Sequence, residues 1–327
     1  MRVLLTGATG FLGSHLAKRL VSLGYDTAAL HRKQSNAETL SVLGVHPIPG
    51  DFDNLRCLRD AVAGHDLVIH AAADIRGWTP DPGLQLEANV GNTQRIAKAC
   101  RLESVGRLIH VSSVSAIGIP GGPACPADEN FAFNLRGRRF NYHLSKKQAE
   151  DAVLREVADG LDAVIVNPGS IFGPHGSRYR GAEIIRKVSR GKIVTCFNGG
   201  RCIVHVEDVV DGILSAIRNG VCGDRYILGG DNVSFREIAR RASEAMGLHP
   251  LLLAVPSFLA AAAVSIGEAV HPGGQFMPRL AALYNDCLFQ YYVSDRAVRV
   301  LGFAPRKFTS VLEECLAFGR LNKLTEA

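Results

Sequence analysis

The chain has 327 residues, 47% hydrophobic and 21% charged, so it can bury a sizeable core in one or two domains and is too apolar to be disordered. Its formal net charge is +6, but Lys and Arg are spread along the sequence, which excludes a basic tract for nucleic acid and favours anionic small molecules as ligands. The eight cysteines contain no CxxC pair, so we expect neither a metal site nor a disulfide framework, and we expect a cytoplasmic protein.

The first half of the chain alternates short apolar runs with longer helical patterns. In segments such as FLGSHLAKRLVSLG and NVGNTQRIAKACRLE, apolar residues recur at intervals of three and four, which is typical of crossover helices. This alternation predicts an α/β fold, a Rossmann-type doubly wound parallel sheet. The predicted strands are Arg2–Gly7, Asp26–His31, Asp66–Ala71, Arg107–Ser112 and Asp162–Pro168.

The regular alternation stops after Pro168, in the Gly-rich stretch GSIFGPHGSRYRG. We therefore expect a smaller, mixed C-terminal substrate lobe, packed against the first domain with the ligand site in the cleft between them. The segment CIVHVEDVVDGILSAIRNG restores a strand and a helix, which indicates that the chain returns to the first lobe. The predicted domains are residues 1–170, with a return segment near 203–220, and residues 171–202 and 221–327.

Three glycines directly follow the first predicted strand, in VLLTGATGFLGSHLAKRL. Gly7 can make the tight turn, Gly10 lets the backbone approach a pyrophosphate, and Gly13 lets helix and strand pack closely. A turn that needs glycine only for positive φ is a weaker interpretation, because the three glycines are in register at one strand-helix junction.

This opening, TGATGFLG, resembles that of the extended short-chain dehydrogenase/reductases, the NAD-dependent epimerase/dehydratase family. The resemblance covers nearly the whole chain and is closest in pattern to dihydroflavonol reductases, 3β-hydroxysteroid dehydrogenases and β-keto acid reductases. It implies a nicotinamide cofactor bound at the glycine turn and an enzyme that acts on a CH–OH group.

The second predicted strand ends in LHRK, where an NAD enzyme usually has an acidic residue that holds the ribose hydroxyls. A guanidinium there suits the 2′-phosphate of NADP instead, so Arg32 predicts NADP (NADPH) as cofactor, with NAD as the alternative. A basic loop in solvent is the other interpretation of this short run.

The resemblance implies further cofactor contacts. The segment GDFDN lies along the adenine, HAAA runs past the phosphates and ribose, NVGNT starts a helix near the nicotinamide, and NPGSIFGP passes the carboxamide. Turn formation, core packing and, for Asn89, helix N-capping are the alternatives. The predicted cofactor-binding residues are Gly7, Thr9, Gly10, Phe11, Leu12, Gly13, Arg32, Asp51, Phe52, Ala71, Ala72, Ala73, Asn89, Lys146, Pro168, Gly169 and Ile171.

A tyrosine and a lysine, Tyr142 and Lys146, are four residues apart in the helical pattern YHLSKKQAEDAVLREVA, so both side chains share one face. A free tyrosine titrates at about 10, and a nearby cation lowers that value by favouring the phenolate. The resemblance implies a catalytic triad: Ser113, rather than Ser112, orients the carbonyl, Tyr142 is the general acid or base, and Lys146 binds the nicotinamide ribose and tunes Tyr142.

Two substrate classes compete. The reduction of an apolar ketone, of steroid, flavonoid or long-chain β-keto acid type, is favoured by VNP at Val166–Pro168 and by the apolar stretch Leu251–Gly267. That stretch is shorter than the roughly 20 residues of a spanning helix and contains Pro256. We interpret it as a buried or pocket-lining helix, with a membrane-surface contact as the alternative.

The alternative is a nucleotide-sugar epimerase or dehydratase that retains its NAD(P). It is supported by Arg201, the substrate candidate, at the position where such enzymes pair an arginine with the nucleotide diphosphate. Asn285 and Asp286 stand where a second arginine is expected, which argues against it. A cofactor-binding regulator without turnover is a further alternative, but all three catalytic positions are filled.

The expected partners are a small-molecule substrate and a second copy of the chain in a homodimer. We expect no nucleic acid, no spanning membrane segment, and at most a peripheral contact with a membrane. Three arginines before the catalytic helix, Arg136, Arg138 and Arg139, are interpreted as part of a solvated loop, with an anionic substrate group as their alternative ligand.

Overall fold

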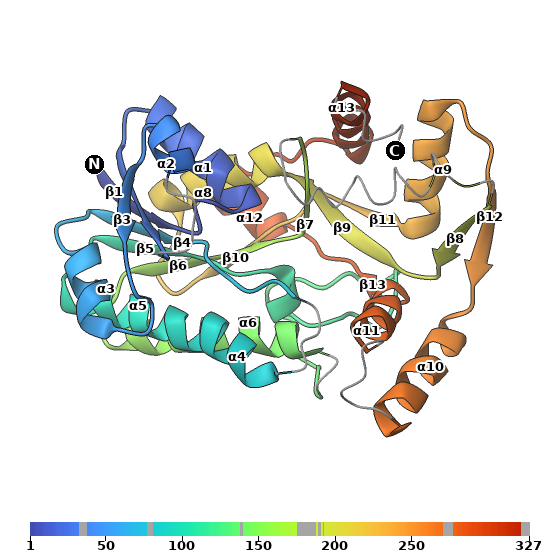
Figure 1. The fold of residues 1–327 in the computed structure, drawn as a ribbon, viewed down its shortest axis with the longest axis horizontal. Coiled ribbons are helices and arrows are strands. Elements are labelled where there is room, and N and C mark those ends of the chain that lie inside the picture. Colours follow the sequence, from blue (N-terminus) through green and yellow to red (C-terminus); the bar gives the residue numbers. More distant parts are fainter. Residues whose placement is uncertain are drawn as a thin grey trace.

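The computed structural model describes residues 1–32, 38–76, 81–137, 140–174, 188, 191, 193–270 and 277–321, and it has the predicted α/β architecture with a Rossmann-like sheet (Figure 1). The strands are β1 (Arg2–Thr6), β2 (Asp26–His31), β3 (His46–Pro49), β4 (Leu67–His70), β5 (Arg107–Val111), β6 (Ala163–Pro168), β7 (Ser170–Phe172), β8 (Ile193–Phe197), β9 (Gly200–His205), β10 (Arg225–Leu228), β11 (Asp231–Ser234), β12 (Leu251–Val255) and β13 (Phe289–Gln290). The α-helices are α1 (Phe11–Ser22), α2 (Glu38–Val42), α3 (Leu55–Val62), α4 (Pro82–Leu86), α5 (Asn92–Leu102), α6 (Asn141–Ala158), α8 (Val206–Asn219), α9 (Phe235–Met246), α10 (Ser257–Val270), α11 (Met277–Asp286), α12 (Asp295–Leu301) and α13 (Phe308–Leu321).

Of the described residues, seven parallel strands form the main sheet in the order β10-β6-β5-β4-β1-β2-β3. The helices α1, α8 and α12 cover one face and α3, α5 and α6 the other (Figure 1). Both faces are therefore buried, which explains why the central strands are continuous apolar runs rather than alternating ones. The carboxyl ends of β1, β4, β5 and β6 meet at one edge, where ligands bind in such sheets.

One strand of the main sheet departs from the predicted domains. β10 pairs in parallel with β6, although residues 221–327 were assigned to the substrate lobe. The strand predicted in the return segment, β9, lies instead in the second sheet, and only the helix that follows it, α8, packs on the main sheet. The chain thus returns to the first domain one strand later than its sequence pattern indicates.

The described part of the second lobe contains two small sheets. β9 pairs with β11, β13 and β7, and β8 pairs with β12. Its core is separate from those of the main sheet and includes Val233, Ile238, Phe308 and Leu316. A further small cluster beneath the 3₁₀ turn Val114–Ala116 joins the lobes, and Tyr292 within it donates a hydrogen bond of 2.6 Å to the Gly118 carbonyl.

The apolar stretch Leu251–Gly267 is not one buried helix, so the expectation of a buried helix is wrong. Pro256 divides it into the strand β12, which pairs with β8, and the helix α10. Most of its described side chains are exposed, including Phe258 at 67% and Ile266 at 63%, whereas Val264 is buried. Among the described residues, no helix combines the length and apolar character of a membrane span.

Candidate functional site

The glycine turn joins β1 to α1 in close contact with the chain that leaves β4. Gly7 has a φ of +77°, and a Cβ there would lie 2.7 Å from the Ala72 nitrogen. A Cβ on Gly13 would lie 2.0 Å from the Gly7 carbonyl oxygen. Gly10 is the N-cap of α1 and has no side chain that could cap it, so the positively polarised helix end stays accessible to an anion. This cradle fits a dinucleotide pyrophosphate, with Thr9, Phe11 and Leu12 around it.

A buried histidine holds the alanine segment beside this turn. Thr93 donates to the Asn89 carbonyl (2.6 Å), so its oxygen accepts from Nε2–H of His70 (3.0 Å). Nδ1 of His70 then accepts from the Thr6 hydroxyl (2.7 Å), whose oxygen accepts the Ala72 N–H (3.2 Å). Burial lowers the pKa of His70 to about 3, so the imidazole is neutral, as this chain of hydrogen bonds requires. Ala71 and Ala72 are thereby fixed against Gly7, and Ala73 is exposed.

Asn89 supports the same segment through its side chain. It lies inside a π-helical turn (Glu87–Gly91), so the N-cap interpretation is wrong. Its Oδ1 accepts from the Asp74 N–H (2.7 Å), and its Nδ2 donates to the Asp74 carbonyl and to the Ser145 hydroxyl (both 2.9 Å). The Asn89 side-chain amide therefore links the loop after β4 to α6, and its hydrogen bonds are made to groups of the protein.

At the end of β2, Arg32 is exposed, and its Cζ lies 5.9 Å from the centre of the Phe52 ring. Phe52 is buried and its carbonyl accepts from Arg95 Nε (2.7 Å), while the Asp51 carboxylate accepts from the Asp53 N–H (3.0 Å). Arg32 and Phe52 thus form one surface at the carboxyl end of β2, where an adenosine half can lie.

The two serines after β5 have different surroundings. Ser112 is buried and its hydroxyl donates to the Glu150 carboxylate at 2.5 Å. Ser113 is half-buried and caps the 3₁₀ turn, where its Oγ accepts from the Ser115 N–H at 3.2 Å. The hydroxyl hydrogen of Ser113 is therefore available to a carbonyl oxygen, whereas that of Ser112 is committed to Glu150.

Tyr142 and Lys146 occupy the first two turns of α6. Lys146 is 2% exposed and its Nζ donates to the Val111 carbonyl at 3.0 Å, at the end of β5. Burial lowers the pKa of Lys146 to about 8, although the nearby Glu150 opposes that shift. Tyr142 is half-buried one helical turn away, so an ammonium group and a phenol share the face that meets the strand ends.

Two buried polar residues behind this face were missed as site residues. Glu150 accepts from Asn167 Nδ2 (2.5 Å) as well as from Ser112, and Arg225 approaches it at 3.3 Å. Asn167 Nδ2 also donates to the Ser113 carbonyl at 2.9 Å. The sequence signal for Glu150 is its spacing of four from Lys146 on one helix face, which continues the Tyr142 and Lys146 spacing.

The chain leaving β6 crosses between the two lobes. Pro168 is buried, the Gly169 N–H donates to the Leu228 carbonyl at 3.0 Å, and Ile171 is half-buried in β7. A Cβ on Gly169 would lie 2.7 Å from the Cys202 carbonyl oxygen, so the backbone passes very close to β9.

The guanidinium of Arg201, in β9, donates its hydrogen bonds to acceptor groups of the protein itself. Its Nη1 donates to the carbonyls of Gly200 (3.0 Å) and Leu288 (3.1 Å). Its Nη2 donates to the Asn285 carbonyl (2.9 Å) and the Asp286 carboxylate (3.1 Å). All four Nη hydrogens are therefore used, and the guanidinium also lies over the Phe235 ring at 5.0 Å.

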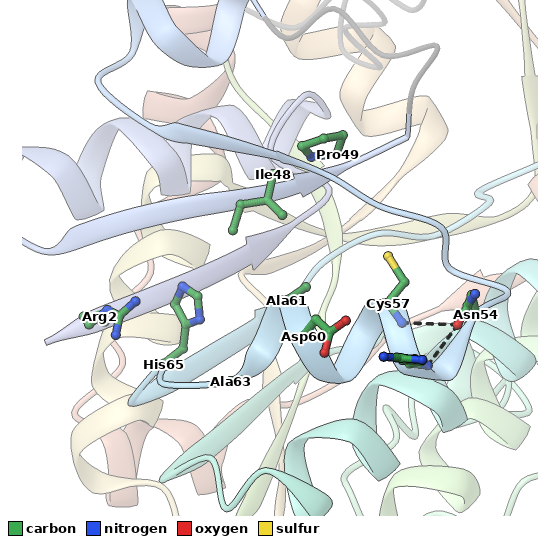
Figure 2. Close-up of a pocket in the computed structure, with 10 residues that line it drawn as sticks. Arg2, Ile48, Pro49, Asn54, Cys57, Asp60, Ala61, Ala63 and His65 are labelled. Atoms are coloured by element: carbon green, nitrogen blue, oxygen red, sulfur yellow. Dashed lines mark hydrogen bonds between the residues drawn. The ribbon is translucent and has the colours of Figure 1, made fainter.

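Of the three arginines before α6, Arg136 is exposed, and Arg138 and Arg139 lie outside the described residues, as does Lys33. A cavity of about 490 Å³ lies elsewhere, along α3. Figure 2 shows His65 at one end of it and Cys57 at the other. Its lining contains none of the predicted site residues, so the candidate site is defined by the converging strand ends and not by this cavity.

A parallel sheet with a glycine turn at its ligand edge, and a Ser, Tyr and Lys set around the same edge, defines a nicotinamide-dinucleotide enzyme of the short-chain dehydrogenase/reductase type. Residues 3–229 match the NAD dependent epimerase/dehydratase family. The chain belongs to this family, in its extended short-chain dehydrogenase/reductase branch, and is an NAD(P)-dependent enzyme.

Relatives align over nearly their full lengths. A sterol demethylase protein B from Methylococcus capsulatus is 28% identical and covers 98% of both chains. A putative dihydroflavonol 4-reductase from Synechocystis is 30% identical, over 95% of this chain and 92% of its own. A 4-hydroxy-2-methyl-3-oxo-4-farnesyl-3,4-dihydroquinoline-1-oxide ketoreductase from Stigmatella aurantiaca is 31% identical, over 94% of this chain and 92% of its own.

Solved structures share the whole fold. The crystal structure of gox2253 superposes with a TM-score of 0.84 at 31% identity and covers 98% of each chain. MoeE5 in complex with UDP-glucose and NAD gives a TM-score of 0.76 at 25% identity, over 99% of this chain and all of its own.

Proposed function

We propose that the protein is an NADP(H)-dependent oxidoreductase that interconverts a ketone and a secondary alcohol on a largely apolar substrate. The observation that carries this choice is the state of Arg201. Its four Nη hydrogens bind protein acceptors, one of them the Asp286 carboxylate, which would repel a nucleotide diphosphate. An uncharged substrate does not need this guanidinium.

The proposed chemistry divides among the three residues around the strand ends. When bound at the glycine cradle, NADPH supplies the hydride for the carbonyl carbon. The Ser113 hydroxyl donates a hydrogen bond to the carbonyl oxygen, and Tyr142 donates the proton that completes the alcohol. Lys146 would stabilise the phenolate that remains and hold the ribose hydroxyls of the bound cofactor, and Arg32 would pair with its 2′-phosphate.

The names of the relatives support an apolar carbonyl substrate. They include a sterol demethylase protein, a dihydroflavonol reductase and the ketoreductase of a farnesyl quinoline oxide. The second candidate function is nucleotide-sugar epimerisation or dehydration, which the likeness to MoeE5 with its UDP-glucose supports.

A thermal-shift comparison with NADP(H) present separates these candidates. We expect steroids, flavanonols or long-chain β-keto acids to raise the melting temperature and UDP- or dTDP-sugars to leave it unchanged. Stabilisation by sugar nucleotides alone would overturn the choice. A Tyr142→Phe protein that turned over the ketone as fast as the wild type would refute the catalytic assignment of Tyr142. A wild-type protein that binds NADP(H) but turns over none of these compounds would leave a cofactor-binding regulator as the better account.

A further inference from the structure

A second histidine, next to Tyr142, is buried without hydrogen bonds. His143 is 6% exposed, and among the residues that the structure describes neither of its ring nitrogens has a hydrogen-bond partner. Burying polar atoms without a partner costs free energy, so native proteins rarely keep such groups without a reason. A ligand that supplies the missing partner is one such reason.

The surroundings of His143 place it where the catalytic helix meets the second lobe. The ring of Phe140 packs edge-on against the imidazole, with centroids 5.6 Å apart and an angle of 88°. Phe140 also lies 6.1 Å from the ring of Tyr284, in the last turn of α11. The following residues of α11 are those that Arg201 binds, so the Arg201 contacts hold this aromatic wall beside Tyr142.

The imidazole is uncharged in this position. Burial, together with the smaller effect of the nearby Arg201, lowers the pKa of His143 to about 4. A neutral imidazole has one donor and one acceptor nitrogen, which suit a hydroxyl or a carbonyl and provide no counter-charge for a carboxylate or phosphate. The ring centroids of His143 and Tyr142 are 6.2 Å apart, so the imidazole lies near the carbonyl that Tyr142 would hold.

We propose that His143 is a substrate-recognition residue that hydrogen bonds to an uncharged oxygen group, a hydroxyl or second carbonyl, carried by the substrate beside its reacting ketone. This inference rests on the proposed ketone reduction and narrows its substrates to hydroxy-ketones and diketones. The imidazole is covered, and Phe140 packs against it, so the proposal requires the Phe140 ring to move aside when the substrate binds.

The test compares kcat/KM with NADPH for two matched pairs of ketones: 1-tetralone with 2-hydroxy-1-tetralone, and flavanone with 3-hydroxyflavanone. We expect the wild type to prefer the hydroxylated member of a pair by about tenfold or more, the value of one hydrogen bond to a polar group that is otherwise left unpaired. In His143→Leu this preference falls to about one. His143→Gln keeps an uncharged donor and acceptor, so we expect it to retain part of the preference for the hydroxylated ketone.

A matched control is His110→Leu. Within the described part of the chain, His110 is also buried with both ring nitrogens unpartnered, but it lies within β5 and stacks on His70, with ring centroids 5.6 Å apart. We expect His110→Leu to keep the wild-type preference. Ligand-free His143→Leu should melt at the same temperature as the wild type or higher, because it removes unpaired buried atoms. If His143→Leu does not fold, His143→Phe replaces it.

Each outcome decides a different claim. A preference that survives in His143→Leu, or a wild type that reduces both members of each pair equally, overturns the role of His143 and leaves ketone reduction standing. A lower melting temperature with an unchanged preference assigns His143 a structural role instead. Failure of the wild type to reduce any of the four ketones with NADPH counts against the proposed function itself.

Discussion

The guanidinium of Arg32 determines the cofactor in this account. Replacing it by Glu puts a negative charge beside the 2′-phosphate position, so we expect kcat/KM for NADPH to fall more than tenfold, since a hydrogen bond to a charged group contributes about 1.5–3 kcal/mol. The value for NADH should change much less. Initial rates with both cofactors measure the ratio.

The control for Arg32→Glu is Arg56→Glu, which makes the same charge change at another exposed position, in α3. An equal loss with both cofactors in Arg32→Glu, or an equal loss of NADPH selectivity in Arg56→Glu, would contradict the assignment.

Lys146 has a pKa of about 8 because it is buried, so it is charged below that pH and becomes neutral above it. The charge supports Tyr142, and we therefore expect kcat/KM for ketone reduction to fall as the pH rises through about 8. Lys146→Arg keeps its charge at these pH values and should move the fall to higher pH, whatever its effect on the absolute rate. A pH profile between 6 and 10 tests this.

Lys147→Arg is the control for that profile, because Lys147 pairs with Asp151 on the adjacent face of α6. It should retain the wild-type pH dependence. A fall at the same pH in Lys146→Arg as in the wild type would show that another group titrates.

The junction between β1 and α1 depends on Gly13, where a methyl group would lie 2.0 Å from the Gly7 carbonyl oxygen. We expect Gly13→Ala to push the helix from the strand, with a loss of about 1–3 kcal/mol in the free energy of unfolding, as for other overpacked sites. NADPH binding should weaken at least tenfold, because the helix end that faces the pyrophosphate moves. Urea unfolding and a fluorescence titration with NADPH measure both effects.

Gly121→Ala is the matched control, since a Cβ at Gly121 meets no atom within 4 Å. It should change neither quantity. Wild-type NADPH affinity in Gly13→Ala would contradict the proposed cradle.

The elements that could be predicted from sequence are those with a strong local signal. β1, β2, β4, β5 and β6 all fall within one residue of their predicted ranges, because each is a buried apolar run bounded by turn residues. β3 was not predicted, since His46–Pro49 contains two prolines and lies at the sheet edge, where proline is tolerated. The stretch after Leu251 was misread because its hydrophobicity gives no information on whether a partner covers it.

Contacts between residues that are far apart in the sequence could not be predicted from the sequence pattern. Arg201 could be located in a strand from its neighbours, but three of its four acceptors come from residues more than 80 positions away. Glu150 and Asn167 meet in the same way, since α6 and β6 must first pack together. Local spacing predicts that Tyr142 and Lys146 share one helix face, whereas the partners that set their surroundings depend on the tertiary fold.

At the scale of the whole molecule, the edge of the main sheet that would bind the dinucleotide faces a second lobe in which Arg201 is bound to acceptors of the protein itself. The central proposal is that the protein carries out the net reduction of a ketone. The most direct test incubates purified protein with NADPH and either 3-hydroxyflavanone or UDP-glucose. The oxidation of NADPH is followed by the loss of its absorbance, and the products are analysed. The account predicts stoichiometric NADPH oxidation and an alcohol product with the ketone. Conversion of the sugar nucleotide without net change in the cofactor, and no reaction with the ketone, would contradict it.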